Sequence, residues 1–323
     1  MALHIPSPPI SGFHLGPLFV HFYGLMYVIG ITLAVLITQR RWRAAGGDPA
    51  LVSDVALWAV PAGLIAARIY FDITTPMDIP HVWYGVFAIW SGGLGIWGGI
   101  AGGAAAGIWR IRRAGASPGA FGNAVAPALL VAQAIGRVGN YFNQELFGKP
   151  TTLPWGLQIA PGNRPAAYRG YPTFQPTFLY EIIFDLALAA ALVWLGHHRR
   201  IRPWGLFALY VAGYSAFRIF EESIRIDSSA HILGLRLNFF VATVMTLVGL
   251  TWFAFVQRKQ PDAPSAAAPA AEPVPAAGAN ADGANADGAS TAGATATAGP
   301  GRTTAGDDDD GSSSGVPSGA AGR

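Results

Sequence analysis

The sequence predicts an all-α polytopic membrane protein with seven transmembrane helices, an outer head loop, an external N-terminus and a cytoplasmic C-terminus. Three observations lead to this fold class. Of the 323 residues, 52% are hydrophobic and only 12% are charged, whereas an ordinary soluble domain carries roughly 25% charged residues. Apolar residues gather in runs of about twenty, the length that spans a bilayer core. Clusters of arginine follow every second run, as expected for cytoplasmic loops.

The first helix is predicted over residues 18–37, and the arginines at 40–43 place its end in the cytoplasm. The second, over 51–71, returns to the outer face and carries Arg68 near its outer end. The third, over 92–109, is rich in glycine, and small residues let membrane helices approach closely. A second arginine cluster follows it, which again indicates the cytoplasmic side.

The fourth helix is predicted over residues 120–135 and delivers Arg137 to the outer side, where a long polar loop follows over 138–175. The remaining helices are predicted over 177–196, 205–220 and 237–256. Eleven of the twenty-one basic residues lie against the four predicted cytoplasmic helix ends, which supports this topology.

The chain divides into a membrane domain, residues 1–259, and a tail, residues 260–323. The tail is rich in alanine, glycine, proline and threonine, a composition that cannot bury a core. We therefore expect a disordered cytoplasmic tail without a catalytic role. The N-terminal residues lack the basic stretch, short apolar run and cleavage site of a signal peptide, so we expect the first helix to be retained.

Charge and cysteine content limit the function. The formal net charge is +3 and the pI is about 9.3, but a basic excess in such an apolar chain belongs to cytoplasmic loops. Nucleic-acid binding is therefore excluded. The chain has no cysteine, which excludes a disulfide framework, a thiolate metal site and a cysteine nucleophile. Any thiol in the chemistry has to come from a partner.

The stretch GRVGNYFNQELFG at 136–148 places polar residues directly after an apolar run. They include Arg137, Asn140, Asn143 and Glu145. Arginine binds phosphate oxygens with a bidentate fork, and asparagine is a natural partner for glycerol hydroxyls or for loop carbonyls. A lone arginine near a helix end can instead extend to the interface without any function.

Further charged residues are predicted at the same outer level. Tyr214, Arg218 and Glu222 recur at every fourth residue, so they lie on one stripe of the sixth helix, and the spacing allows Arg218 to pair with Glu222. Glu181 lies one turn into the fifth helix. A charge at the centre of a span costs roughly 2.5–3.5 kcal/mol, and opposite charges on neighbouring helices reduce this cost. The arginine–glutamate pair either joins two helices or helps to form an outward-facing cavity suited to a phosphate ester.

Three residues near this level have two open interpretations. Tyr23 and Tyr180 are either interfacial aromatics or functional residues. His21 is either a proton acceptor or a hydrogen-bonded packing residue. Asp185, deeper in the fifth helix, has no role that the sequence indicates.

The residues at 136–148 resemble the signature of the bacterial prolipoprotein diacylglyceryl transferase family. That signature reads glycine, arginine, any residue, glycine or alanine, asparagine, an aromatic residue, any residue, asparagine, any residue, glutamate, any two residues and glycine. HFYGLMY from His21, GGLGIWGG from Gly92, PTFLYE from Pro176 and the spacing in the sixth helix extend the resemblance over roughly residues 15–258.

The resemblance implies a multi-pass enzyme of the bacterial cytoplasmic membrane with seven transmembrane helices and no cofactor or metal ion. It implies transfer of the sn-1,2-diacylglyceryl group from phosphatidylglycerol to the lipobox cysteine thiol of a prolipoprotein signal peptide, with release of glycerol phosphate. The catalytic residues that it implies are Arg137, Arg218, Glu222, Tyr23 and Glu145. The residues that it implies for phosphatidylglycerol binding are Arg137, Asn140, Asn143, Gly148, Glu181, Tyr214 and Arg68.

Two positions depart from the family pattern. Many members have a histidine in the glycine-rich third span that has been proposed as the base, and the matching residue here is Trp97. Gln175 stands about where a second histidine is often found. A thiol has an ordinary pKa of about 8.5 and reacts as the thiolate. If the histidine base is required, the chain is inactive; otherwise the base is dispensable or is replaced by His21, Glu145 or the surrounding arginines.

A transporter or flippase for anionic lipid head groups is the alternative function, because it would use the same arginines without a reaction. Transporters often show repeated halves, and the sequence shows no internal repeat. An intramembrane protease fits less well, because the sequence lacks a plausible serine–histidine or paired-aspartate arrangement.

Overall fold

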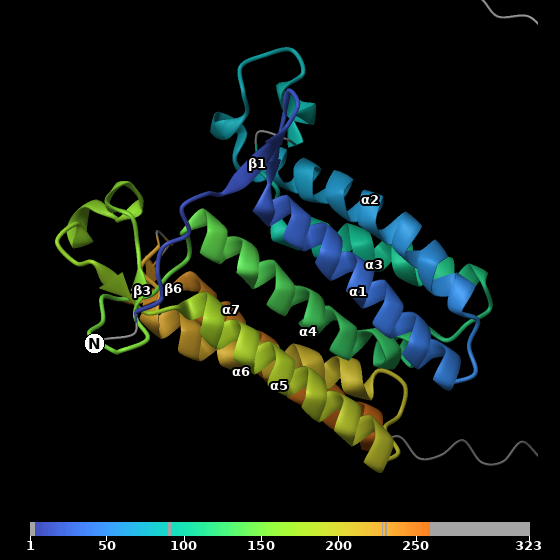
Figure 1. Cartoon of the computed structure of the whole chain (residues 1–323). Coiled ribbons are helices and arrows are strands. Elements are labelled where there is room, and N and C mark those ends of the chain that lie inside the picture. Colours follow the sequence, from blue (N-terminus) through green and yellow to red (C-terminus); the bar gives the residue numbers. More distant parts are fainter. Residues whose placement is uncertain (1–3, 90–91, 228, 230, 259–323) are drawn as a thin grey trace, which may run out of the picture. The chain divides into compact units, whose positions relative to one another are not determined.

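The computed structural model describes residues 4–89, 92–227, 229 and 231–258. The predicted tail, residues 260–323, lies outside the described residues. The described chain is mostly helical (Figure 1). Its seven long helices are α1 (Phe22–Ala44), α2 (Pro49–Thr74), α3 (Ile96–Arg113), α4 (Pro118–Asn143), α5 (Thr177–His198), α6 (Gly205–Ile224) and α7 (Leu237–Arg258).

Each predicted helix corresponds to one of these helices, but two begin later than the sequence predicts. Leu18–His21 form strand β2 instead of the first turn of α1, and they pair with strand β1 (Gly12–Leu15). Helix α3 begins at Ile96 because Gly92 and Gly93 have φ angles of 87° and 79°. Glycine adopts this left-handed region readily, but a right-handed helix cannot contain it.

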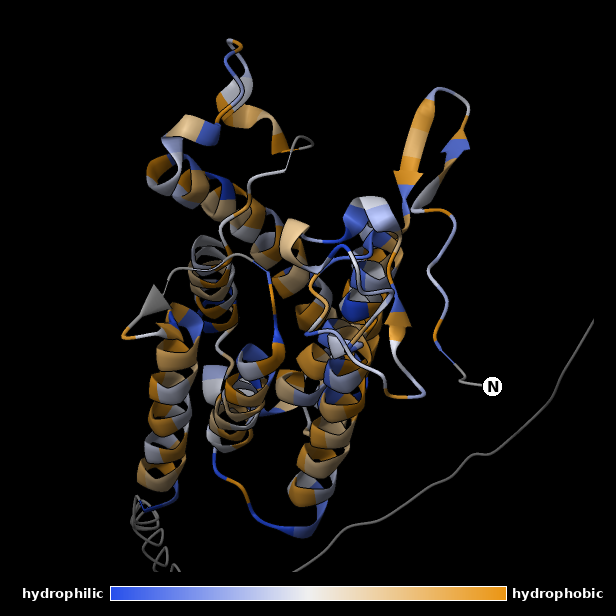
Figure 2. Ribbon diagram, turned by 90° about the vertical axis from the view of Figure 1, so that its left-hand side faces the viewer, coloured by the Kyte–Doolittle hydropathy of each residue, from blue (hydrophilic) through white to orange (hydrophobic). Residues whose placement is uncertain are grey.

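Five of the helices, α1, α2, α4, α5 and α7, are long and apolar enough to cross a membrane, so the chain is a polytopic membrane protein. The other two carry three charged residues each. Those of α3 are arginines at its C-terminal end, within 110–113, and those of α6 are Arg218, Glu221 and Glu222. Figure 2 shows hydrophobic residues along the helices and hydrophilic residues mainly at helix ends and connections.

Helix α4 lies between α1 on one side and α5 and α6 on the other (Figure 1). Helix α2 packs on α3, and α6 packs on α7. The α2–α3 contact uses glycine and alanine, so the two backbones come very close. A Cβ atom added to Gly98 would lie 2.3 Å from the carbonyl oxygen of Ala66. The glycine-rich sequence of the third span thus serves helix packing.

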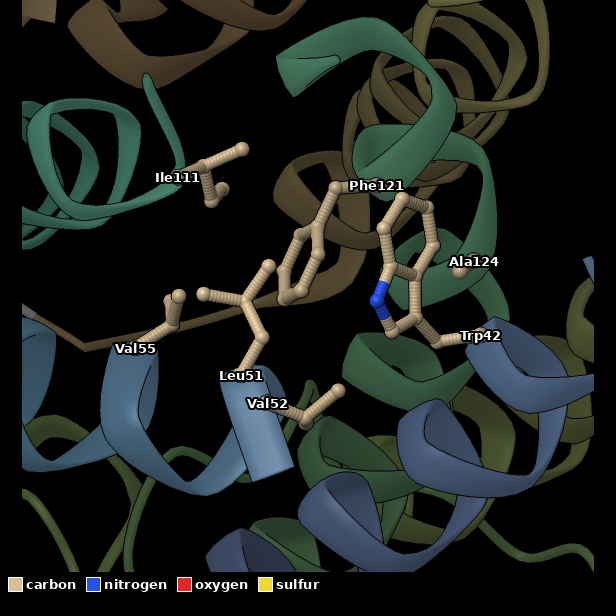
Figure 3. Packing of buried hydrophobic residues seen from close by; sticks show 7 residues of the cluster. All are labelled: Trp42, Leu51, Val52, Val55, Ile111, Phe121 and Ala124. Carbon is tan, nitrogen blue, oxygen red and sulfur yellow. The ribbon is translucent and has the colours of Figure 1, made fainter. Parts of the chain in front are cut away.

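A buried cluster ties α1, α2, α3 and α4 together near their predicted cytoplasmic ends (Figure 3). It consists of Trp42, Leu51, Val52, Val55, Ile111, Phe121 and Ala124. The rings of Trp42 and Phe121 meet edge to face with centroids 5.3 Å apart, a favourable arrangement for aromatic pairs. A second buried cluster joins α4, α5 and α6 and consists of Ala126, Leu130, Ala189, Leu192 and Leu206.

Short hairpins and turns lie at the opposite helix ends. The head loop, residues 144–176, contains the pair β3 (Leu157–Gln158) and β4 (Thr173–Phe174), and the pair β5 (His231–Ile232) and β6 (Leu235–Arg236) precedes α7. The head loop has its own core of Phe147, Leu157, Ile159 and Phe174. Single 3-10 turns are η1 (Pro76–Asp78), η2 (Gly85–Phe87), η4 (Pro161–Asn163) and η5 (Ala166–Tyr168).

The substitution Gly98→Ala is expected to destabilise the protein by about 1–3 kcal/mol, because the new methyl group collides with the backbone of α2. Gly99→Ala is the matched control, since its Cβ atom would lie 3.5 Å from that of Ala67, an ordinary contact. The measurement is the free energy of unfolding of the purified protein in mild detergent. Equal stability of the two variants would contradict the close α2–α3 packing.

Candidate active site

Helix α4 is longer than the sequence predicts, and this changes where the signature residues lie. The helix continues to Asn143 and ends at Gln144, whose φ of 51° is left-handed. The expectation of a loop from Val138 onward is therefore wrong for its first turns. Arg137 and Asn140 therefore project from the last turns of a helix. The backbone stays helical there although the segment contains Gly139 and Asn140. A helix holds these side chains more rigidly than a loop would.

Arg137 joins three helices through one carboxylate. Its Nη2 atom lies 2.7 Å from Oε1 of Glu181 on α5. The hydroxyl of Tyr214 on α6 donates to the same oxygen at 3.1 Å, and Arg137 also donates to that hydroxyl at 3.4 Å. Glu181 is fully buried, whereas 20% of the Arg137 side chain is exposed. The guanidinium is thus anchored by a buried carboxylate and remains partly exposed.

A chain of amide hydrogen bonds continues from Arg137 to the head loop. Nη1 of Arg137 donates to Oδ1 of Asn140 at 3.1 Å. The side-chain amides of Asn140 and Asn143 donate to Oε1 of Glu145 at 2.9 Å and 3.2 Å. Glu145 therefore folds back over the end of α4 and orients both asparagines. These four signature residues form one connected group.

Tyr23 reaches this group from α1. Its ring lies against the backbone of Gly139, where an added Cβ atom would be 2.4 Å from the ring. Its hydroxyl lies 2.9 Å from the hydroxyl of Tyr27. Gly139 is thus required for the close approach of the tyrosine, and Asn140 is the next residue of α4.

A second group of charges surrounds Arg218 at the end of α6. The pairing of Arg218 with Glu222 that the spacing predicts is present, and Nη1 of Arg218 also contacts Oε2 of Glu221 at 2.5 Å. Nε of Arg236 on β6 donates to Oε2 of Glu222 at 2.6 Å. About a fifth of the Arg218 side chain is exposed, at 18%. Like Arg137, Arg218 is held by buried carboxylates and keeps a reachable edge.

Asp227 fastens the chain after α6 to both flanking arginines. Its carboxyl accepts from Nε of Arg225 at 2.7 Å and from Nη2 of Arg236 at 3.0 Å. Burial favours the neutral form of Asp227, but the hydrogen bonds and charges of the two arginines outweigh it and hold the pKa of Asp227 below its ordinary value. The carboxyl is therefore ionised at neutral pH.

The sequence that builds these two groups is shared with known proteins. A family model described as prolipoprotein diacylglyceryl transferase matches residues 11–255. The chain belongs to this family. A phosphatidylglycerol–prolipoprotein diacylglyceryl transferase from Frankia alni is 48% identical over 258 residues, which cover 79% of this chain and 68% of the relative.

Two further relatives carry the same name. The protein from Bifidobacterium adolescentis is 45% identical over 271 residues, which cover 79% of this chain and 80% of the relative. The protein from Cutibacterium acnes is 44% identical over 261 residues, which cover 80% of this chain and 88% of the relative.

Two of the residues expected to bind lipid have backbone partners. Arg68 donates to the carbonyls of Gly85, Val86 and Gly92 at 2.6–2.8 Å, and it pairs with Asp72. Gly148 donates its N–H to the carbonyl of Gln175 at 2.9 Å and pairs with Arg225 in an isolated bridge. In the described residues, Arg68 therefore holds the loop after α2, and Gly148 lets the head loop cross the end of α6.

Of the positions considered for the base, Glu145 belongs to the Arg137 group, whereas Trp97, Gln175 and His21 have other neighbours. Trp97 stands at the start of α3 and is 47% exposed, Gln175 accepts from the hydroxyl of Tyr180 at 3.1 Å, and exposed His21 packs on Phe19. Among the described residues no group of three or more histidine, aspartate or glutamate side chains is placed to hold a metal ion.

Sequence reasoning missed Glu221 and Arg236 as members of the Arg218 group. Glu221 stands three residues after Arg218, a spacing that also brings side chains together on a helix. Arg236 follows Glu222 by fourteen residues, across a hairpin that the sequence does not predict. The sequence did hold one signal for Arg236. Basic residues are usually concentrated on the cytoplasmic side, so an arginine predicted on the outer side suggests a specific partner.

Lowering the pH is expected to remove the stability that Asp227 supplies. Its folded-state pKa lies below the unfolded value of about 3.9, so the contribution is complete above the unfolded value and is lost as the pH falls through the folded one. The difference in unfolding free energy between the unaltered protein and Asp227→Asn should be constant above about pH 5 and should shrink below about pH 4. A difference that does not change down to about pH 2 would contradict this assignment.

Proposed function

We propose that the Arg137 and Arg218 groups form the site at which this chain transfers the diacylglyceryl group of phosphatidylglycerol to a prolipoprotein. The chain is a transferase of lipoprotein biosynthesis and a multi-pass protein of the bacterial plasma membrane, as its family membership and its apolar helices show. The observation that carries the assignment of the site is the Arg137 guanidinium, which is anchored by buried Glu181 and still partly exposed.

The lipid phosphate binds between the two arginines. Arg137 and Arg218 each keep an exposed edge, and arginine matches phosphate oxygens with parallel N–H donors. The thiolate of the prolipoprotein cysteine attacks the glyceryl carbon, the carbon–oxygen bond to the phosphate breaks, and glycerol phosphate leaves with the bonding electrons. Negative charge grows on the phosphate oxygens during this step, so donors already aimed at them lower the barrier.

The other predicted site residues position the two arginines and the lipid. Glu181 and Tyr214 fix Arg137, and Glu222 fixes Arg218. Tyr23 and Asn140 orient the glycerol, while Asn143 and Glu145 hold Asn140 in place. Gly148 and Arg68 act through the backbone segments that they hold, at the head loop and at the loop after α2.

Helices α3 and α6 also span the membrane, which gives seven spans with the N-terminus outside and the C-terminus in the cytoplasm. Their charges do not oppose this topology, because those of α3 lie in its last turn and those of α6 are paired with one another. Residues 1–259 form the transferase domain, and residues 260–323 form a cytoplasmic tail.

The substitution Arg137→Gln is expected to lower transfer by about a hundredfold or more, because the transition state loses a fixed cationic donor. Purified protein is incubated with phosphatidylglycerol vesicles and a lipobox peptide, and the mass of the peptide is followed. Arg112→Gln, at the far end of α3, is the control and should keep full activity. Lipid that binds to the unaltered protein without any mass gain of the peptide would favour a lipid flippase instead.

The topology can be tested with single cysteines, because the chain has none of its own. His81→Cys, in the loop after α2, should react with a membrane-impermeant maleimide in intact spheroplasts. Ala45→Cys, between α1 and α2, should react only after the membrane is permeabilised. Both positions are exposed, so labelling of Ala45→Cys in intact cells would contradict the proposed orientation.

A further inference from the structure

Polar residues of α4, α5 and α6 form two stacked layers. Helix α5 runs in the direction opposite to α4 and α6, so a position four residues earlier in α4 or α6 lies at the height of a position four residues later in α5. The outer layer consists of Arg137, Glu181 and Tyr214, and all three are linked by hydrogen bonds or an ion pair. The inner layer, one turn farther from the head loop, consists of Gln133, Asp185 and Tyr210.

The inner layer is left with acceptors that have no donor. Gln133 donates to the hydroxyl of Tyr210 at 3.1 Å. Asp185 is fully buried, and neither of its oxygens has a hydrogen-bond partner among the described residues. Oε1 of Gln133 and Oε2 of Glu181 also lack a donor. A buried ionised carboxylate without a partner is very costly, so this arrangement requires an explanation.

The surrounding charges indicate the protonation state of Asp185. On α5 the nearest charge is Glu181, one helical turn away, and Arg137 on α4 is already paired with that glutamate. From α6, Arg218 and Glu221 also interact with Asp185, but they are paired with each other. An ionised Asp185 would therefore add a second negative charge with no cation of its own.

We propose that Asp185 is held protonated and donates its O–H to the free oxygen of Glu181, which makes it a positioning residue for Arg137. The donated hydrogen bond fixes the Glu181 carboxylate, so Arg137 keeps its remaining N–H groups free for a ligand. When Asp185 loses its proton, the added negative charge competes with the lipid phosphate for Arg137. This inference rests on the proposed role of Arg137 in phosphatidylglycerol binding.

Infrared spectroscopy of the purified protein tests the protonation without any assay of activity. The carbonyl stretching band of a protonated carboxyl group should be present at neutral pH and absent in Asp185→Asn. Asp54→Asn is the control, because Asp54 is paired with Arg110 near the predicted cytoplasmic end and should leave the band unchanged. A spectrum in which Asp185→Asn also leaves the band unchanged would overturn the proposal.

Transfer kinetics test the positioning role. The apparent KM for phosphatidylglycerol should rise at alkaline pH in the unaltered protein and should stay flat in Asp185→Asn, whose amide donates a hydrogen bond at every pH. Asp185→Leu should lower transfer by about tenfold or more, since a buried hydrogen bond to a charged group is lost. If Asp185→Asn is as inactive as Asp185→Leu, the proposal fails while the transfer function stands. If the unaltered protein does not transfer lipid, the proposed function fails, and the infrared result still decides the protonation of Asp185.

Discussion

The ion pair of Arg137 with Glu181 is the interaction on which the rest of the site depends. Each charge alone would be costly inside a membrane, so the packing of α4 on α5 is favoured at the height where the two side chains touch. Tyr214 uses the same glutamate oxygen and brings α6 to that point. The location of the Arg137 guanidinium is therefore set by the need to neutralise a buried carboxylate.

The Arg218 group follows the same physical rule with more partners. Three arginines and three carboxylates are brought together at the end of α6, and each carboxylate contacts at least two arginines. Such a network shares the cost of burial among its members. Arg236 and Arg225 also neutralise these glutamates, so Arg218 is one of three cations that share them.

The sequence predicts the seven helices, the polar level and most members of both groups, because apolar length and charge spacing are properties of the chain itself. It does not predict the end of α4. Gly139 and Asn140 are typical of loops, but here the glycine gives room to the ring of Tyr23 and the asparagine bonds to Glu145. Arg236 is missed because its partner lies across a hairpin, a contact that only the folded chain creates.

The apolar cluster of α4, α5 and α6 bears on proton leakage across the membrane. Leu130, Leu192 and Leu206 are buried beyond the inner polar layer, toward the helix ends opposite the head loop. A column of such groups across the whole bilayer would let protons flow down the membrane potential, a drop of about 2.3 kcal/mol per charge at 100 mV. In this bundle the buried apolar cluster separates the polar layers from the opposite helix ends, which would limit such a leak.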